Sequence, residues 1–403
     1  MRPRLPLIVA VAVLIARPGA VAAGEIAAEA ASKDLSGAVG RRQMSVFDQV
    51  WNATELYRDE SNPIVQDLDI TGRFHDQYHW SEGGAADDDG WESRRFRIGL
   101  EARVLHDFTL KAEMTSAPDF DPFFNGFSAL AIQWHPADSF LLTVGKQPAR
   151  FTWDYSTSSN LHPYVERSQL LNEFAPDRSP AISMQGKAGR LNWYAALVSN
   201  TPDREVSREF GTFDGGASII ATLGYDLAEV FRTDAADVRL EYLHSEHNER
   251  STIYNRFDDC LATSLVLREG RASVVTELLA GLGGDHGDAV GLNLMPGWFV
   301  NEKLELVARY QIALSDGAAG LTAQRRYERP AGIPSGDLYQ AAYAGFNWFI
   351  YGPRLRLMGG VEYAGMNGHD AWTALLGVRL YWGPDSRTAF PVAYPYMDRR
   401  GAH

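Results

Sequence analysis

The chain has 403 residues and carries 38 Lys and Arg against 51 Asp and Glu, which gives a formal net charge of −13. This acidity argues against nucleic acid as a partner, and a mean hydropathy of −0.24 excludes a bundle of membrane helices. The single cysteine, Cys260, allows neither an intrachain disulfide nor a cysteine-based metal site.

The N-terminus has the pattern of a secretory signal peptide. Arg2 and Arg4 form a charged region, residues 5–16 are apolar, and residues 21–23 are small enough for cleavage. We therefore expect residues 1–23 to be removed on export. Because no later apolar run reaches the roughly eighteen residues that a spanning helix needs, we expect no helical membrane anchor.

Residues 24–67 differ in composition from the rest of the chain. Residues 24–38 are small and polar, while the apolar residues between Val46 and Arg58 recur at helical spacing. We predict a periplasmic N-terminal segment with a short helix over 46–58 and an irregular link through Asn62 and Pro63. It is either a simple leader or a plug or periplasmic contact.

From residue 68 onward the chain is a series of segments with a period of two. In residues 303–314, Leu304, Leu306 and Ala308 alternate with Lys303, Glu305 and Arg309, which places the two sets on opposite faces of a strand. One such strand fits a soluble sandwich, but the pattern recurs about sixteen times. The predicted strands cover 68–80, 91–105, 108–115, 126–134, 139–147, 180–187, 190–200, 217–227, 237–247, 259–267, 271–281, 289–300, 303–314, 338–350, 354–363 and 371–382.

The last of these strands, 371–382, has tryptophans at both ends of its apolar face, Trp372 and Trp382. Aromatic residues at these positions are typical of a strand that crosses both membrane–water interfaces. The opposite face carries Arg379 and is the wetter of the two.

The connections between the strands alternate in length. Tight turns such as 106–107 and 188–189 alternate with long polar links, and only 228–236 is longer than a tight turn should be. Transmembrane barrels have short periplasmic turns and longer outer loops, whereas a soluble sandwich has no reason to keep this alternation. We predict an all-β transmembrane antiparallel β-barrel of about sixteen strands over 68–382, followed by a C-terminal tail over 383–403. The long links are 81–90, 117–125, 148–179, 201–216, 248–258, 282–288, 315–337 and 364–370.

Several of these segments resemble the phosphate-selective porin O and P family: 72–80, 91–99, 107–113, 142–147, 155–160, 166–168 and 175–177. The resemblance implies a bacterial outer-membrane porin, usually a homotrimer, that passes anions. Two features depart from the family pattern. The chain continues beyond Trp382, where such barrels usually end on an aromatic residue, and its cations are mostly arginine rather than lysine.

The longest link, 148–179, is the predicted constriction loop. It is rich in aromatic residues, whose side chains can pack against one another and against the barrel, so we expect it to be ordered. The resemblance implies that it folds inward and narrows the lumen; the alternative is an outer flap. The loop residues in this prediction are Phe151, Trp153, Asp154, Tyr155, Tyr164 and Glu166.

Cations facing the lumen near this loop are the predicted anion-binding residues. Alternation directs Arg95, Arg97 and Arg103 inward on the second strand and Arg73 inward on the first, and Arg94 joins this set. Lys146 is at the root of the loop, and Arg150 and Arg167 are on it. Asp154 and Glu166 are expected to balance them. For any single arginine the alternative is a lumen salt bridge that stiffens the barrel.

The function predicted from these features is passive diffusion of small solutes and ions across the outer membrane, with anion preference and with phosphate or other oxyanions as candidate solutes. Outer-membrane lipid and small solutes or anions are the expected partners, and no catalytic residue, metal or cofactor is expected. The alternatives are a cation-preferring or general porin, and a structural or enzymatic barrel with no open pore. His75 and His79 are roughly 13 Å apart along a strand, too far to share a metal ion.

Overall fold

The computed structural model describes residues 45–84, 86–201, 213–246, 248, 251, 256–284 and 286–384. The predicted signal peptide, residues 24–44 and the tail from residue 385 lie outside the described residues. Within the described part, no helix combines the length and the apolar character that a membrane crossing requires.

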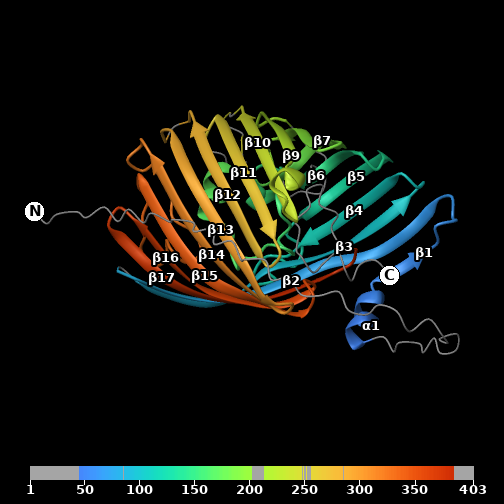
Figure 1. Cartoon of the computed structure of the whole chain (residues 1–403), viewed down its shortest axis with the longest axis horizontal. Coiled ribbons are helices and arrows are strands. Elements are labelled where there is room, and N and C mark those ends of the chain that lie inside the picture. Colours follow the sequence, from blue (N-terminus) through green and yellow to red (C-terminus); the bar gives the residue numbers. More distant parts are fainter. Residues whose placement is uncertain are drawn as a thin grey trace, which may run out of the picture. The chain divides into compact units, whose positions relative to one another are not determined.

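Sixteen of the described strands, β2 to β17, form a closed antiparallel barrel (Figure 1). Each pairs with its neighbour in sequence, and β17 pairs with β2 to close the ring. The sequence-based prediction of the fold is therefore confirmed. The strands are β2 (Val65–Gly83), β3 (Asp87–Val104), β4 (Phe108–Thr115), β5 (Phe127–Ala137), β6 (Phe140–Pro148), β7 (Arg178–Ala188), β8 (Leu191–Ser199), β9 (Ala217–Asp226), β10 (Ala235–Ser245), β11 (Asp259–Glu269), β12 (Ala272–Leu282), β13 (Ala289–Asn301), β14 (Leu304–Ser315), β15 (Leu338–Tyr351), β16 (Leu355–Met366) and β17 (His369–Trp382).

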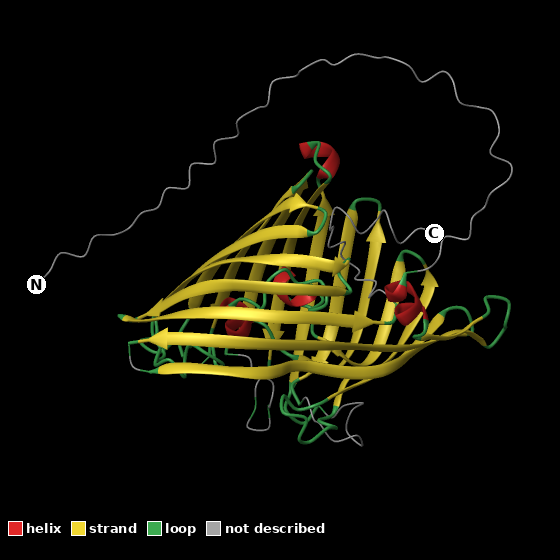
Figure 2. Cartoon of the chain, turned by 90° about the horizontal axis from the view of Figure 1, so that it is seen from below, coloured by secondary structure: helices red, strands yellow, loops and turns green. Residues whose placement is uncertain are grey.

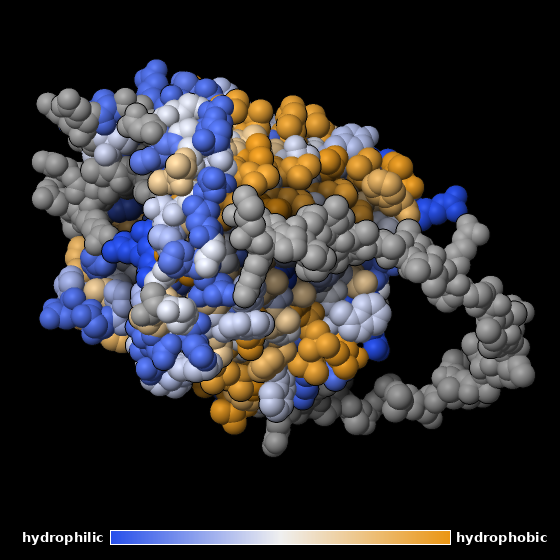
Figure 3. All heavy atoms as spheres, turned by 90° about the vertical axis from the view of Figure 1, so that its left-hand side faces the viewer, coloured by the Kyte–Doolittle hydropathy of each residue, from blue (hydrophilic) through white to orange (hydrophobic). Residues whose placement is uncertain are grey.

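The barrel is apolar outside and polar inside. On β17, Trp372 and Leu376 are exposed on the outer surface, whereas Thr373 and Arg379 point inward and are buried. Figure 3 shows one side of the molecule, where hydrophobic side chains gather in broad patches. An apolar exterior around a polar interior is the arrangement that a barrel in lipid requires. Other exposed outer residues are Leu240, Leu278, Leu306 and Trp348.

Two of the predicted long links are much shorter than expected. β2 and β3 pair as far as Glu82 and Asp87, which leaves only residues 84–86 between them. Likewise, β16 and β17 are joined at Asn367 and Gly368, both with positive φ. The predicted links 81–90 and 364–370 are therefore wrong, because their polar residues continue the strands beyond the apolar part. The irregular link before β10 contains the short helix α4 (Ala228–Phe231).

Residues 45–58 pack against the end of the barrel where the tight turns lie. Helix α1 (Val46–Asn52) begins with a capping box at Ser45 and ends at Asn52. The predicted helix over 46–58 is thus too long, because β1 (Glu55–Arg58) pairs instead with β2, which β17 no longer covers there. The indole Nε1 of Trp51 donates to the carbonyl of Tyr381 at 2.8 Å, tying α1 to the end of β17.

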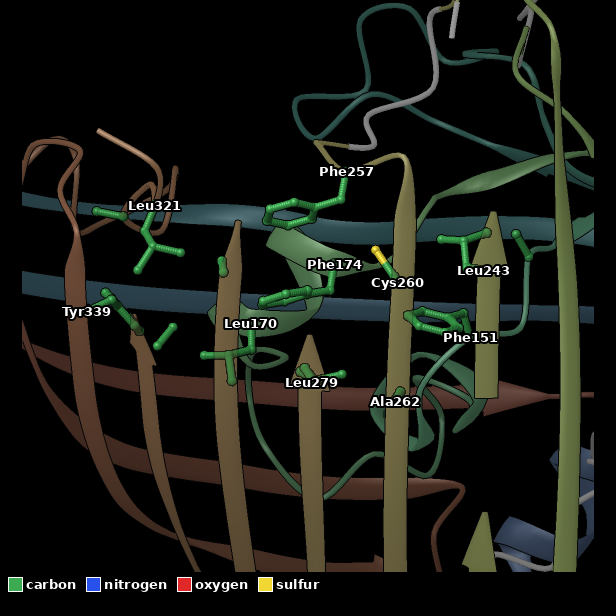
Figure 4. Packing of buried hydrophobic residues seen from close by; sticks show 14 of the residues in the cluster. Phe151, Leu170, Phe174, Leu243, Phe257, Cys260, Ala262, Leu279, Leu321 and Tyr339 are labelled. Atoms are coloured by element: carbon green, nitrogen blue, oxygen red, sulfur yellow. The ribbon is translucent and has the colours of Figure 1, made fainter. Parts of the chain in front are cut away.

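The link between β6 and β7, residues 149–177, lies inside the ring together with its helices α2 (Trp153–Ser156) and α3 (Gln169–Phe174) (Figure 2). We call it the inner loop. Its apolar residues pack on the inward side chains of β10 to β12, as Figure 4 shows. Phe174 stacks on Phe257 with ring centroids 5.1 Å apart. One side of the interior is therefore filled by an apolar core. This core includes Phe151, Leu170, Leu243, Cys260, Leu279 and Leu321.

Candidate functional site: the polar interior beside the inner loop

The inner loop is attached to the barrel wall by hydrogen bonds from several strands. The backbone N–H groups of Thr152 and Trp153 donate to Glu241 on β10 and Glu277 on β12, at 3.0 and 2.8 Å. Further along the loop, Asn347 on β15 donates to the carbonyl of Pro163 at 2.9 Å. The inner loop is therefore hydrogen-bonded to β10 and β12 at one part and to β15 at another, and these bonds hold it across the interior of the barrel.

Asp154 organises the inner loop from within. Its carboxylate accepts from the Ser168 N–H at 2.9 Å and from Arg167 Nη1 at 3.1 Å, and His162 Nε2 lies 2.7 Å from it. Burial would raise the pKa of Asp154, but His162 and Arg167 lower it below its usual value. Burial also lowers the pKa of His162 to about 4, although Asp154 opposes this shift. Asp154 and Arg167 therefore join two parts of the inner loop to each other.

Glu166 is the inner-loop residue that meets β3. Arg94 Nε donates to its Oε1 at 2.6 Å, and Gln77 Nε2 donates at 2.8 Å. Burial would raise the pKa of Glu166, but the charges of Arg94, Arg95 and Arg326 lower it. Arg94 reaches Glu166 because a bulge, where His75 pairs with Arg95 but Asp76 pairs with Ser93, re-aims its side chain.

A second acid, Glu113 on β4, lies among the arginines of β2 and β3. Arg73 Nη2 is 3.3 Å and Arg97 Nη1 is 3.4 Å from its carboxylate, and Arg73 also donates to Ser159 of the inner loop at 3.0 Å. Arg178, at the start of β7, donates to the Ser128 carbonyl at 2.8 Å. Arg73, Arg94, Arg95 and Arg97 are thus brought together with Glu113 and Glu166.

Solvent reaches one wall of the interior and not the other. The side chains of Arg94 and Arg97 on β3 are 20% and 13% exposed, and that of Lys111 on β4 is 30% exposed. Beneath the inner loop, by contrast, Arg309 and Glu362 form an ion pair with both side chains 2% exposed. The accessible polar surface therefore runs along β3 and β4.

The other predicted cations have different places. Arg103 pairs with Asp67 at 2.8 Å and also with Glu60. It lies roughly 20 Å along β3 from Arg97, at the end with the tight turns, so it does not join the group beside the loop. Lys146 is buried near the end of β6. Arg150 donates to Gln185 at 3.0 Å, and burial lowers its pKa.

The predicted aromatic residues of the loop serve packing. Phe151, Trp153 and Tyr164 are buried, and the Tyr164 hydroxyl donates to the carbonyl of Ala308 on β14 at 2.8 Å. Tyr155 lies beneath the guanidinium of Arg167, with its ring centroid 5.6 Å from that group, and its hydroxyl donates to Asp177 at 3.0 Å.

Sequence reasoning did not single out several residues of this interior. The sequence does carry a signal for four of them, because each has an apolar residue immediately before and after it in a strand, which predicts an inward side chain. These four are Glu113, Arg309, Arg356 and Arg379. Arg326, which pairs with Glu92, comes from the link 316–337 and has no such signal. Its position depends on the packing of that link inside the ring.

Comparisons with known proteins agree with this architecture. Residues 68–219 match the model of the family "phosphate-selective porin O and P". No curated protein sequence matches the chain significantly. Together with the closed barrel, the family match supports an outer-membrane porin. The predicted resemblance to this family is thereby confirmed over residues 68–219, and the predicted outer-membrane location is confirmed.

Solved porins share the fold at low sequence identity. OprB of Pseudomonas putida is 12% identical with a TM-score of 0.55, covering 78% of this chain and 94% of that one. OmpF of Salmonella typhi is 11% identical with a TM-score of 0.55, covering 81% and 100%. An anion-selective porin from Comamonas acidovorans is 14% identical with a TM-score of 0.53, covering 78% and 99%. At these identities the likeness concerns the fold.

Proposed function

We propose that the chain is a porin for passive diffusion of small anions, with inorganic phosphate or other oxyanions among its solutes. The observation that carries this proposal is the accessible wall of β3, where Arg94, Arg95 and Arg97 gather beside the inner loop. The inner loop then acts as the constriction, because it holds its aromatic residues against the opposite wall and leaves the side chains of Arg94 and Arg97 partly accessible.

The chemistry of these side chains suits anions. Arginine is charged at all relevant pH values, and its planar fork matches carboxylate and phosphate oxygens. Arg95 makes no hydrogen bond or ion pair with another described residue, so its donors remain available to a passing solute. The two acids of the group, Glu113 and Glu166, are already engaged by Arg73, Arg97 and Arg94.

The acidity of the whole chain is a weak argument for a cation-preferring pore. Several inward acids lie beneath the inner loop rather than on the accessible wall. Glu241, Glu277 and Glu305 are between 1% and 3% exposed. A solute moving along β3 and β4 meets arginines first, and local charge at a narrow point sets selectivity.

We also propose that the porin assembles as a homotrimer. The support is the resemblance given in the sequence analysis, which implies a homotrimer and which the family match over residues 68–219 accompanies. Native mass spectrometry of the protein in detergent tests this directly. A mass of three chains is expected, and a monomer under conditions that preserve a known trimeric porin would contradict the proposal.

Planar-bilayer recording of the refolded protein tests the pore itself. Under a KCl gradient we expect stepwise conductance and a reversal potential on the anion side, and added phosphate should reduce the chloride current. A cation-sided reversal potential would reject the anion preference while leaving a porin. A correctly folded barrel without conductance would favour the structural or enzymatic alternatives.

A further inference from the structure

A row of basic side chains crosses four neighbouring strands of the barrel. Arg356 on β16 is directly opposite Arg379 on β17, Arg379 is opposite His75 on β2, and His75 is opposite Arg95 on β3. Residues directly opposite in an antiparallel pair share one face, and like charges in that position destabilise a sheet. We call the three buried members, Arg356, Arg379 and His75, the basic row, because Arg95 belongs to the accessible wall of β3.

The three members of the basic row are shut off from solvent. Arg356 and His75 are 0% exposed, and Arg379 is 2% exposed. Each arginine binds the inner loop through one terminal nitrogen. Arg356 Nη2 donates to the His162 carbonyl at 2.6 Å, and Arg379 Nη2 donates to the Val165 carbonyl. The row therefore lies between the wall and the inner loop rather than on the accessible surface.

Most of the remaining side-chain nitrogens of these three residues have no partner. Within the described residues, Nε and Nη1 of Arg356, Nη1 of Arg379 and both ring nitrogens of His75 are buried without a hydrogen bond. Buried donors normally find an acceptor, because an unmatched one forfeits its hydration. So many unmatched nitrogens on adjacent strands indicate a missing acceptor at this place.

The missing acceptor is also a missing negative charge. Among the described residues, no carboxylate lies within 4 Å of Arg356 or Arg379, and the carbonyls they bind are neutral. Glu305, which interacts electrostatically with Arg356, accepts from Asn347 at 2.9 Å, and Glu166 is held by Arg94. Buried charges in proteins are paired, since removal from water is costly for an isolated ion.

We propose that the basic row binds one small inorganic anion between β16, β17, β2 and residues 160–165 of the inner loop. The anion accepts hydrogen bonds from the free nitrogens of Arg356, Arg379 and His75 and fastens the loop to the wall. This resident site is distinct from permeation along β3 and does not depend on the selectivity of the pore. Chloride and the oxyanions phosphate and sulfate share the required chemistry.

Thermal unfolding of the full-length protein in detergent tests the resident site. After exhaustive exchange into a buffer without small inorganic anions, chloride, phosphate and sulfate are titrated separately at constant ionic strength. In the wild type, at least one of them should raise Tm by several degrees with saturation. Arg356→Gln and Arg379→Gln should abolish the saturable rise, whereas Arg190→Gln, in the turn before β8, should retain it.

Anomalous diffraction from crystals of the wild type tests the site even if the variants fail to fold. Crystals of the wild type are grown with bromide or selenate, and anomalous difference maps are calculated. A peak within hydrogen-bond distance of Arg356 and Arg379 supports the proposal and tells chloride-like from oxyanion binding. An empty or water-filled site in both crystals, or an equal rise of Tm in Arg379→Gln and wild type, would overturn it.

Discussion

At the scale of single residues, the inward arginines of this barrel differ in what covers them. Arg97 keeps 13% of its side chain accessible, although it is paired with Glu113, while Arg309 is sealed by the inner loop. Alternation predicts that both kinds point inward, because side-chain direction is local. It does not predict accessibility, which depends on where residues 149–177 come to lie. Arg94 is a further case, because a bulge rather than alternation aims it.

The burial of His162 makes the attachment of the inner loop depend on pH. The pKa of His162 is about 4 in the folded loop and 6.5 when the ring is free in water. Between these values the released loop binds more protons, so its attachment weakens as pH falls from 6.5 towards 4, by at most roughly 3 kcal/mol. The lowered pKa of Asp154 acts in the same direction below pH 3.8. Hydrogen exchange at Thr152 and Trp153, corrected for its intrinsic pH dependence, measures this weakening.

The matched variants for this experiment are His162→Gln and His106→Gln. The first removes the buried titrating ring and should flatten the exchange profile between pH 6.5 and 4. The second changes an exposed histidine in the turn after β3 and should keep the wild-type slope. An unchanged slope in His162→Gln would assign the pH dependence to another group.

At the scale of elements, the strands follow from local pattern, but their ends and the segments around them do not. Residues 55–58 have helix-like spacing, yet they form β1, because β17 does not pair with the part of β2 before Gly72 and leaves that edge to β1. In the same way, residues 87–89 are acidic and resemble a loop, but they extend β3, where Asp88 lies 2.8 Å from His79. Both segments become strands because they pair with another strand. The sequence of the segment alone does not indicate that pairing.

Trp51 is the residue that attaches α1 to the barrel. It is buried, its ring centroid is 5.0 Å from that of Tyr351, and it donates to Tyr381. Trp51→Ala should weaken this docking by about 3 kcal/mol, since it removes a buried aromatic side chain and a hydrogen bond. Limited proteolysis should then cleave residues 45–58 faster while the barrel stays intact. Val50→Ala, at an exposed position of the same helix, is the control, and equal rates in both variants would argue against the anchor.

The seam between β2 and β17, which closes the ring, depends on a glycine. Gly72 is directly opposite Trp382, and a Cβ atom there would come within 2.3 Å of the Trp382 ring and 2.5 Å of the Arg97 carbonyl. Gly72→Val should therefore lower the fraction of heat-resistant, closed barrel after refolding, as measured by gel mobility. Gly84→Ala meets nothing within 4 Å and should refold like the wild type. Normal refolding of Gly72→Val would show that the seam adapts.

At the scale of the whole molecule, the fold was predictable and the interior was not. Alternation over some 300 residues, with tight turns at one end, leaves a closed membrane barrel as the consistent solution. The interior depends on two links, residues 149–177 and 316–337, that pack inside the ring through contacts between distant parts of the chain. Arg326 and Tyr327 enter the site only through that packing, so no spacing could indicate them.

We infer that the arginines of β3 give the pore its anion preference. The most direct test is the reversal potential of single channels under a KCl gradient for the wild type, Arg95→Gln and the control Arg190→Gln. Arg95 is chosen because it has no partner among the described residues, whereas Arg190 pairs with Glu229 away from the inner loop. We expect an anion-sided potential in the wild type that moves towards the cation side in Arg95→Gln alone. A cation-sided potential in the wild type, or an unchanged one in Arg95→Gln, would contradict it.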